Sequence, residues 1–466
     1  MSVQRKMKYK NKKLKNFLMN KIFLLSGLAL FLFSQAAQAL LFKAEEFTLP
    51  NGLHCVIVEN HKAPLVEQML WYKAGSVDEQ KGKGGSAHLL EHLMFRGTKY
   101  VKDGEFNRIM EKYGISDNAF TSFDVTAYHQ FADVSKLEVL LALEADRMEN
   151  LNFDEKAFEA ERKIVYEERM QRVENNPSSP FYERLRMMLW GDNPYGRPVT
   201  GMPQEIMSLQ YSDIMDFYHK YYAPNNAILL LSGDITSQEI RPLIEKYYGN
   251  IKPRNVQREK FEVNKHPFYE ILEMSLPDVS SVKVYERYLL PKHSELKNKI
   301  YDYLVLSEYL GGGVTSALYK DLVVQQKIAL SVGASYNFVS NGESVFAFNL
   351  IPQNQQKFER EEVIASLREA ADKAVKNMDE KRLTQIKRKM SADLVFVNDN
   401  PKDAANWIGA MLASGFSLEE VQNYESNLNA VSLKGVKDAY ESLKSAPHIN
   451  GILLPENKII DRGVEK

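Results

Sequence analysis

The spacing of hydrophobic residues along the chain predicts where its strands and helices lie. Residues 53–58 and 66–72 are rich in β-branched and aromatic side chains and are separated by a turn-forming segment, which predicts a pair of strands. Between residues 135 and 148, leucines recur at the spacing of a helix, and the highly charged segment 154–173 predicts a second helix. The apolar run 227–231 predicts a short strand that ends this half of the chain.

The second half of the chain repeats this plan. Residues 152–156 read NFDEK and residues 377–381 read NMDEK, and each pentapeptide opens a long charged helix. Before each helix come a turn and a helix, a β-rich run (118–131 and 331–350) and an amphipathic helix, in the same order. This repeated order indicates an internal duplication whose offset is the size of one domain.

A polar segment at residues 251–267, which contains two prolines, separates the halves and predicts a linker. We therefore expect an N-terminal domain over residues 44–250 and a C-terminal domain over residues 268–466. The chain has 466 residues, of which 44% are hydrophobic, so it is long and apolar enough to bury a large core.

Residues 1–39 predict a secretory signal peptide. They carry eight lysines and arginines and no acid, a nearly unbroken apolar run at residues 22–33, and the sequence Ala37-Gln38-Ala39, after which we expect cleavage. The alternative is an uncleaved N-terminal anchor, since residues 40–42 prolong the apolar stretch. We expect an exported protein in a bacterial periplasm, with outright secretion as another alternative.

Cleavage would change the formal net charge from −1 to −9, because the removed segment carries only basic charges. An acidic mature chain argues against binding to nucleic acid and leaves room for basic peptides or a basic partner. The chain has a single cysteine, Cys55, so it can form no internal disulfide, and apolar neighbours predict that Cys55 is buried in a strand.

Residues 88–92 read HLLEH and predict a metal site on a helix capped by Ser86. His88 and His92 would lie one turn apart on the same side, with Glu91 on the adjacent flank. Imidazoles suit zinc, and a catalytic zinc takes three protein ligands and leaves one position for water. Zinc lowers the pKa of that water to about 7, and Glu91 is placed to accept its proton. The alternative is an ordinary pair of core or surface histidines. The second half has no such pair, so we expect one zinc ion per chain.

The third ligand must come from elsewhere in the chain. Glu161, Glu167 and Glu168 lie on the charged helix that follows, where solvated surface carboxylates are the ordinary finding. Glu161 and Glu168 are two turns apart and share a face, whereas Glu167 points about 100° away from Glu168. The spacing does not choose among the three.

The residues around these positions resemble those of the M16 (pitrilysin-like) metallopeptidases, in which H-x-x-E-H is an inverted zinc motif. The resemblance rests on residues 85–98, 118–128, 161–168, 194–198 and 222–226, and it extends over nearly the whole mature chain. The short members that the chain is similar to are the mitochondrial processing peptidase β subunit and bacterial relatives of about this length.

This resemblance implies roles for particular residues. It implies that zinc is bound by His88, His92 and Glu168 and that Glu91 is the general base. It also implies that Glu161 supports the ligand geometry without touching the metal.

The resemblance further implies an α+β fold of two similar α/β halves, each a curved sheet covered by helices, with metal only in the first. Asn118 and Ala119 would lie on an edge strand that binds an extended peptide by adding it to the sheet. Such members work in pairs, and the four domains of a pair enclose a chamber in the manner of a clam-shell.

One departure from the family pattern concerns the second half. Many members carry there, after a Gly-rich turn, an Arg and a Tyr that contact the substrate. This chain has the turn at residues 311–313, but Val323 and Leu330 stand at the Arg and Tyr positions. We therefore expect a homologous subunit without the zinc motif to supply that pair in a heterodimer, with a homodimer as the alternative.

Together these features predict a zinc metalloendopeptidase that cuts peptides or unfolded polypeptides. The rival is a non-catalytic scaffold subunit of the same fold, which the missing Arg and Tyr favour and the complete zinc site opposes. A zinc-binding module without hydrolysis would need a fourth protein ligand, and none is evident.

Overall fold

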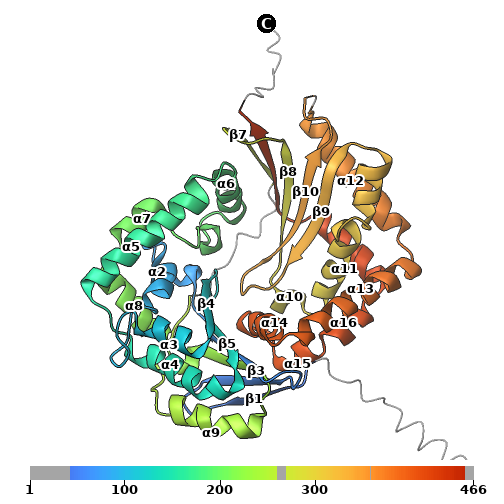
Figure 1. Ribbon diagram of the computed structural model, residues 1–466. Coiled ribbons are helices and arrows are strands. Elements are labelled where there is room, and N and C mark those ends of the chain that lie inside the picture. The colour runs from blue at the N-terminus through green and yellow to red at the C-terminus, as the bar shows by residue number, and fades with distance from the viewer. Residues whose placement is uncertain (1–41, 260–268, 357, 457–466) are drawn as a thin grey trace, which may run out of the picture. The chain divides into compact units, whose positions relative to one another are not determined.

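The computed structural model describes residues 42–259, 269–356 and 358–456 (Figure 1). The predicted signal peptide, and the predicted linker beyond residue 259, lie outside the described residues. Within these three ranges, no helix is both long enough and apolar enough to span a bilayer.

Six strands form the first sheet, in the order β1-β2-β6-β3-β5-β4. Their bounds are β1 (Ala44–Thr48), β2 (His54–Glu59), β3 (Leu65–Tyr72), β4 (Ser116–Thr121), β5 (Thr126–Asp133) and β6 (Ala227–Gly233). The predicted pairing of residues 53–58 with residues 66–72 is wrong, because β6 lies between β2 and β3 and bonds to both. β4 pairs with β5 alone and forms one edge of the sheet.

Five strands form the second sheet, in the order β7-β11-β8-β10-β9. Their bounds are β7 (Tyr269–Leu276), β8 (Lys283–Leu290), β9 (Ala329–Asn337), β10 (Ser344–Pro352) and β11 (His448–Pro455). Without β1, the two sheets have the same strand order. The first strand in the chain lies beside the last and parallel to it, and across the rest of the sheet come the second, the fourth and, at the edge, the third. The identical topology confirms the internal duplication and the predicted α+β class.

Helices connect the strands in a similar order in both halves. Those of the first half are α2 (Ser86–Leu93), α3 (Glu105–Tyr113), α4 (Leu137–Asn150), α5 (Glu155–Arg169), α6 (Ser179–Trp190), α7 (Pro203–Ser208), α8 (Tyr211–Tyr221) and α9 (Ser237–Tyr248). Those of the second half are α10 (His293–Leu296), α11 (Lys299–Gly311), α12 (Arg360–Asn377), α13 (Glu380–Asp399), α14 (Pro401–Ala413), α15 (Leu418–Gln422), α16 (Tyr424–Ala430) and α17 (Leu433–Lys444).

The two repeated pentapeptides start their helices in the same way. Asp154 accepts a hydrogen bond from the N–H of Ala157 at the start of α5 (2.8 Å). Asp379 accepts one from the N–H of Arg382 at the start of α13 (2.7 Å). Such N-caps satisfy helix N–H groups that have no partner within the helix. The shared sequence is therefore a shared helix start.

One helix of each half packs against the sheet of the other half. α6 contacts β7 and β11, and lies on the opposite side of the second sheet from α11, α12 and α13 (Figure 1). α14 contacts β3 and β6 of the first sheet. Glycines permit a close approach at both places: Gly451 of β11 lies against Phe181 and Leu185 of α6, and Gly409 of α14 lies against the ring of Trp71 on β3. The domain boundaries at residues 250 and 268 stay predictions, because each half is covered partly by the other.

Candidate metal centre

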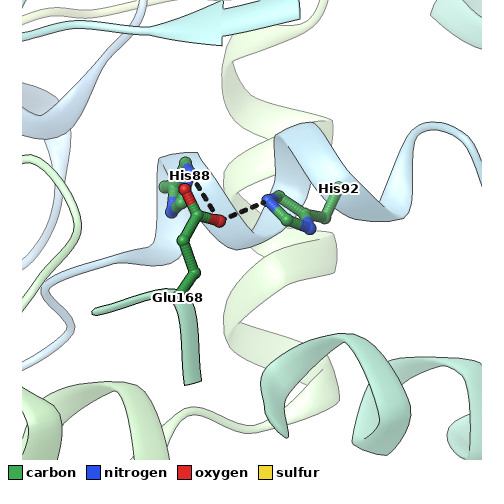
Figure 2. A group of neighbouring side chains, drawn as sticks. All are labelled: His88, His92 and Glu168. Atoms are coloured by element: carbon green, nitrogen blue, oxygen red, sulfur yellow. Dashed lines mark ion pairs between the residues drawn. The ribbon is translucent and has the colours of Figure 1, made fainter. Parts of the chain in front are cut away.

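The fold brings the two predicted histidines and one glutamate together (Figure 2). His88 and His92 lie one turn apart on α2, and Glu168 reaches them from the end of α5. Oε2 of Glu168 lies 3.4 Å from Nε2 of His92 and 3.9 Å from Nε2 of His88. One donor atom from each residue lies within 4.8 Å of the other two, and no other cluster of this kind occurs in the described part of the chain.

The structure separates the three candidate glutamates of α5. Glu168 faces the histidines, and Glu167 is exposed to solvent. Glu161 is buried, and its Oε2 accepts a hydrogen bond from Nδ1 of His92 (3.0 Å). The geometry therefore favours Glu168 as the third ligand and puts Glu161 behind His92.

Arg96 holds Glu161 from the other side. Its Nε donates a hydrogen bond to Oε1 of Glu161 (2.6 Å), and a second N–H of the same guanidinium reaches the same oxygen. Burial alone would raise the pKa of Glu161, but the hydrogen bonds from His92 and Arg96 lower it. With both carboxylate oxygens engaged, the ring of His92 is held with its Nε2 toward Glu168.

The two histidines have different electrostatic surroundings. Burial and the neighbouring His92 lower the pKa of His88 to about 4, so the His88 ring is neutral at pH 7. Burial also opposes a charge on His92, but hydrogen bonds to Glu161 and Glu168 outweigh it and raise the pKa of His92 to about 9. A metal at His92 therefore has to displace a proton that these carboxylates otherwise hold.

The N-terminus of α2 is held by a glutamate from the preceding loop. Gly85 precedes the helix in the left-handed region (φ 91°), and the Glu79 carboxylate accepts hydrogen bonds from the N–H groups of Gly85 (3.1 Å) and Ala87 (2.9 Å). Burial raises the pKa of Glu79, although these two bonds favour its charged form. The prediction that Ser86 caps the helix is wrong, because Ser86 is the first helical residue and its hydroxyl donates to the carbonyl of Lys83 (2.7 Å).

Glu91 lies on α2 and lines a cavity together with His92. Its Oε2 accepts a hydrogen bond from the hydroxyl of Thr121, the last residue of β4 (2.5 Å). Burial raises the pKa of Glu91, and the bond from Thr121 opposes that rise. A carboxylate whose pKa is raised is a stronger base, so Glu91 is suited to accept a proton.

The same cavity, of about 340 Å³, is lined by Asn118 and Ala119 of the edge strand β4. Because β4 pairs with β5 on one side only, its other side is open to an added strand. Oδ1 of Asn118 accepts a hydrogen bond from the N–H of Ala119 (2.8 Å). The predicted peptide-binding edge therefore runs past Glu91, and Thr121 joins the two.

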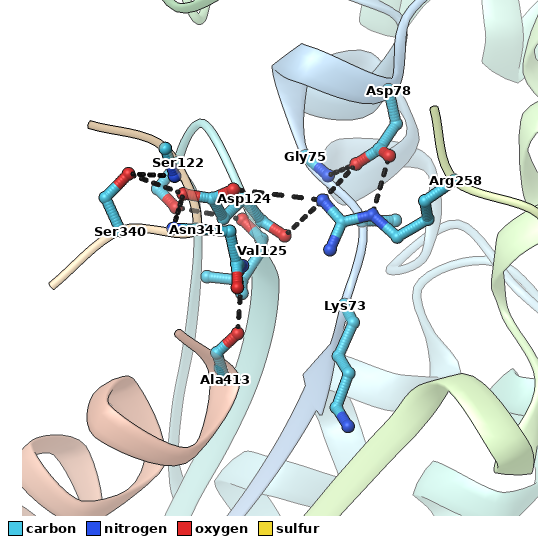
Figure 3. A network of polar contacts seen from close by, with 12 residues as sticks. Lys73, Gly75, Asp78, Ser122, Asp124, Val125, Arg258, Ser340, Asn341 and Ala413 are labelled. Atoms are coloured by element: carbon cyan, nitrogen blue, oxygen red, sulfur yellow. Dashed lines mark hydrogen bonds and ion pairs between the residues drawn. The ribbon is translucent and has the colours of Figure 1, made fainter. Parts of the chain in front are cut away.

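A polar network holds the turn between β4 and β5 (Figure 3). Asp124 accepts a hydrogen bond from the hydroxyl of Tyr195 (2.6 Å) on one oxygen, and on the other from the hydroxyl of Ser340 and the N–H of Asn341 (both 3.2 Å). Arg258 donates to the backbone carbonyl of Asp124 (3.3 Å). Ser340 and Asn341 belong to the loop between β9 and β10, so the end of β4 is tied to the second half.

The donor set and its spacing fit a zinc ion. Zinc binds imidazole nitrogen and carboxylate oxygen at roughly 2.0–2.2 Å, so tetrahedral ligand atoms lie about 3.3–3.5 Å apart. The 3.4 Å between His92 and Glu168 meets this spacing, and the 3.9 Å between His88 and Glu168 is slightly wider. Oε1 of Glu168 pairs with Arg172, which leaves Oε2 to face a metal.

Two family models match the chain, and together they cover more than half of it. The one described as Insulinase (Peptidase family M16) matches residues 55–202, and the one described as Peptidase M16 inactive domain matches residues 208–390. The chain belongs to peptidase family M16.

Several known proteins are similar to it over long stretches. Zinc protease PqqE of Helicobacter pylori is 36% identical over 317 residues, which are 68% of this chain and 71% of that protein. The probable mitochondrial-processing peptidase subunit beta of Schizosaccharomyces pombe is 31% identical over 212 residues, which are 45% of this chain and 46% of that protein. The crystal structure of a protease from Helicobacter pylori matches with a TM-score of 0.82 and 29% identity, over 89% of this chain and 100% of that one. These matches confirm the predicted M16 membership and fold.

Three residues of this M16 site were not assigned a role by the sequence. Thr121 bonds to Glu91, and Arg96 bonds to Glu161. Both stand inside the segments that resemble the family, and that position was the available signal. Glu79 caps α2 from the preceding loop, and no sequence pattern indicated this role.

The two positions at which we predicted a departure from the family pattern, Val323 and Leu330, lie in the second half. Val323 is part of a π-helical turn (Tyr319–Gln325), and Leu330 is half exposed at the start of β9. Neither side chain has a polar group, so neither can replace an Arg or a Tyr in binding a peptide.

Proposed function

We propose that this chain is a zinc-dependent endopeptidase that holds one zinc ion with His88, His92 and Glu168 and uses Glu91 as the general base. The observation that carries this proposal is the convergence of three ligand side chains and a partly buried carboxylate, Glu91, beside the edge strand β4. The Helicobacter pylori relative is named a zinc protease, which supports the same chemistry.

Each side chain has a separate task in this proposal. Zinc, when bound, supplies a Lewis acid and lowers the pKa of a nearby water to about 7. Glu91 accepts the proton of the attacking water and returns it to the leaving amine when the peptide bond breaks. Thr121 orients the Glu91 carboxylate, while Glu161 and Arg96 keep the His92 ring in position.

The proposed substrates are extended peptides and unfolded polypeptides. A peptide that adds to β4 forms backbone hydrogen bonds irrespective of its sequence, and a segment whose backbone is already paired within a folded protein is not available for them. Asn118 and Ala119 would align the peptide, with the Asn118 side chain giving up its bond to the N–H of Ala119.

The proposed assembly is a heterodimer with a homologous subunit that lacks the zinc motif and supplies an Arg and a Tyr. Val323 and Leu330 support this proposal because this chain lacks the pair itself. The Schizosaccharomyces pombe relative is named as a subunit, which also supports it. A homodimer is the alternative assembly.

The proposed location is the periplasm of a bacterium, after export with the predicted signal peptide at residues 1–39. Fractionation of cells that express the tagged chain checks this part: the mature chain should appear in the periplasmic fraction, shortened at Ala39. A full-length chain in the membrane fraction would instead support an N-terminal anchor.

The test of the mechanism is the zinc content and peptidase activity of the mature chain, alone and with the suspected partner. We expect about one zinc per chain and cleavage of unstructured quenched-fluorescence peptides. Glu91→Gln should keep its zinc and lose about a thousandfold in kcat/KM, because a general base contributes roughly 10²–10⁴ in rate. Glu167→Gln is the matched control, since Glu167 is exposed on α5 next to Glu168.

The outcomes separate the proposed enzyme from a scaffold subunit. Zinc binding without cleavage of any peptide, even with the partner present, would support the scaffold. Activity that appears only with the partner supports the heterodimer, whereas full activity of this chain alone would contradict it.

A further inference from the structure

A second cavity, of about 520 Å³, begins at the end of the edge strand β4. Ser122 and Phe123 line it, and they directly follow Thr121, whose hydroxyl bonds to Glu91. Other walls come from α6 and from strands β8, β9 and β10. A strand advances about 3.3 Å per residue, so a peptide paired with β4 reaches this cavity within two or three residues of Glu91.

Two arginines line this cavity from different elements. Arg186 comes from α6, and its guanidinium lies 4.6 Å from the centre of the Phe123 ring. Arg287 comes from β8 and donates to the carbonyls of Glu286 (3.1 Å) and Phe348 (2.9 Å) and to Oδ1 of Asn349 (2.8 Å). In the described part of the chain, no carboxylate lies within ion-pair distance of either arginine.

The acidic residues of the cavity do not neutralise the arginines. The carboxylate of Asp124 is occupied by Tyr195 and by the loop between β9 and β10. Glu343 also lines the cavity, and it takes part in an interaction of its own.

The positive charge of Arg287 is held at a cost. Burial lowers the pKa of Arg287 to about 10, and the charge of Arg186 acts in the same direction. Arg186 is exposed to solvent, and Glu183 favours its charged form. An anion bound by both guanidiniums would offset their repulsion and the desolvation of Arg287, and charge-assisted hydrogen bonds to arginine are among the strongest.

The remaining walls are suited to the rest of an acidic residue. Tyr182, Leu185, Leu189 and Trp190 of α6 line the same cavity. Such surfaces pack against the methylene groups of a side chain or against a neighbouring apolar residue. The cavity thus combines a cationic end with apolar walls.

We propose that this cavity is a subsite that binds a carboxylate of the peptide substrate within about three residues of the scissile bond, with Arg186 and Arg287 as the anion-binding residues. The inference rests on the proposed function, because it requires a peptide on β4. It also runs against the net charge of −9 expected for the mature chain, since the groups proposed to bind the carboxylate are two arginines.

The test is a set of paired peptides in which each position, up to three residues on either side of the cut, carries Glu or Gln. A further pair ends in a free acid or an amide, which separates a side-chain carboxylate from the terminal one. At one position we expect the wild-type chain, with its partner if required, to prefer Glu by about tenfold in kcat/KM. In Arg186→Gln this ratio should fall to near one, and in Arg186→Glu the same position should favour Lys over Gln.

Arg184→Gln is the matched control, because Arg184 is exposed on the same helix and does not line the cavity. It should keep the wild-type Glu-to-Gln ratio. The proposal is overturned if the wild type shows no acid preference at any position, or if Arg186→Gln retains it.

Failure of the proposed function would look different. If no peptide is cut at all, fluorescence anisotropy with the Glu91→Gln chain measures the binding of the same labelled peptides. We expect the Glu peptide to bind about tenfold more tightly than its Gln partner, and this difference to vanish when Arg186→Gln is added. Equal binding of the two peptides would rule out the subsite whether or not the chain is an enzyme.

Discussion

The two halves of the molecule share a fold plan and differ where the metal centre lies. In each half an aspartate caps the long charged helix, Asp154 in α5 and Asp379 in α13. Seven residues after the cap, α5 has Glu161, which bonds to His92, whereas α13 has Ile386, which is buried. Glu161 and Ile386 thus occupy equivalent positions in the two halves. Glu161 makes hydrogen bonds there, whereas Ile386 packs among apolar residues.

The remaining ligand positions differ in the same way. Fourteen residues after the cap, α5 has Glu168 beside the histidines, and α13 has Asp393, which is exposed and pairs with Lys389 (3.4 Å). α11, which occupies the place of α2 in the second half, contains no histidine and buries leucines instead. The metal-binding residues are therefore specific to the first half, and the shared fold plan does not require them.

The largest effect is expected at the paired positions Glu168 and Asp393. Glu168→Gln should lower peptidase activity by more than about a hundredfold at limiting zinc, because a three-ligand site loses a charged ligand. Asp393→Asn should leave zinc content and activity unchanged. Zinc titration followed by activity assays measures both. Equal losses of activity in Glu168→Gln and Asp393→Asn would show that the two halves do not differ at this position in the way described.

The next largest effect concerns Glu161 and Ile386. Glu161→Gln weakens the hold on His92, so we expect a loss of roughly 10–100-fold in zinc affinity with little change in stability. Ile386→Gln should do the reverse: it should leave zinc affinity unaltered and cost about 2–4 kcal/mol of folding stability, because a polar group is buried. Competition with a zinc chelator and urea unfolding separate the two results.

A smaller effect is expected where α14 covers the first sheet. A Cβ at residue 409 would lie 2.3 Å from the ring of Trp71, which is buried and cannot move away easily. Gly409→Ala should therefore destabilise the protein by about 1–3 kcal/mol, although alanine favours the helix. Gly451→Ala should cost less, because its Cβ would lie 2.8 Å from the ends of the Phe181 and Leu185 side chains. A wild-type urea midpoint in Gly409→Ala would contradict this packing.

The smallest effect concerns the start of α11, where Asp302 is partly buried. Burial raises the pKa of Asp302 from 3.8 to about 6. An acid with a raised pKa binds its proton more tightly in the folded state, so its contribution to stability is lost as pH rises from about 4 to about 6. Asp302→Asn should stabilise the protein at pH 7 by less than about 1 kcal/mol, since solvent screens the side chain. Thermal unfolding at pH 4 and pH 7 should show the gain only at pH 7.

The sequence was informative wherever a feature depends on residues close together in the chain. The histidine pair, the starts of the two charged helices and the strands at residues 53–58, 66–72 and 227–231 follow from local spacing and local hydrogen bonds. The repeated pentapeptide revealed the duplication because both copies form the same local structure.

Features that join distant segments were not predictable in this way. Residues 53–58 and 66–72 were expected to pair, but the partner of both is β6, which lies more than 150 residues further along the chain. The choice among Glu161, Glu167 and Glu168 depends on how α5 lies against α2, and spacing along one helix does not contain that information. Glu79 caps α2 from outside the helix, so no helix-start pattern includes it.

The packing of α6 on the second sheet and of α14 on the first sheet bears on how such a molecule originated. In either half alone, the sheet face that the other half now covers would be exposed to water. The unit that was duplicated therefore needed a second copy of itself for burial of that face. The present chain is then equivalent to a dimer whose two copies are joined covalently by a linker. Once joined, the two copies could diverge in sequence without separating.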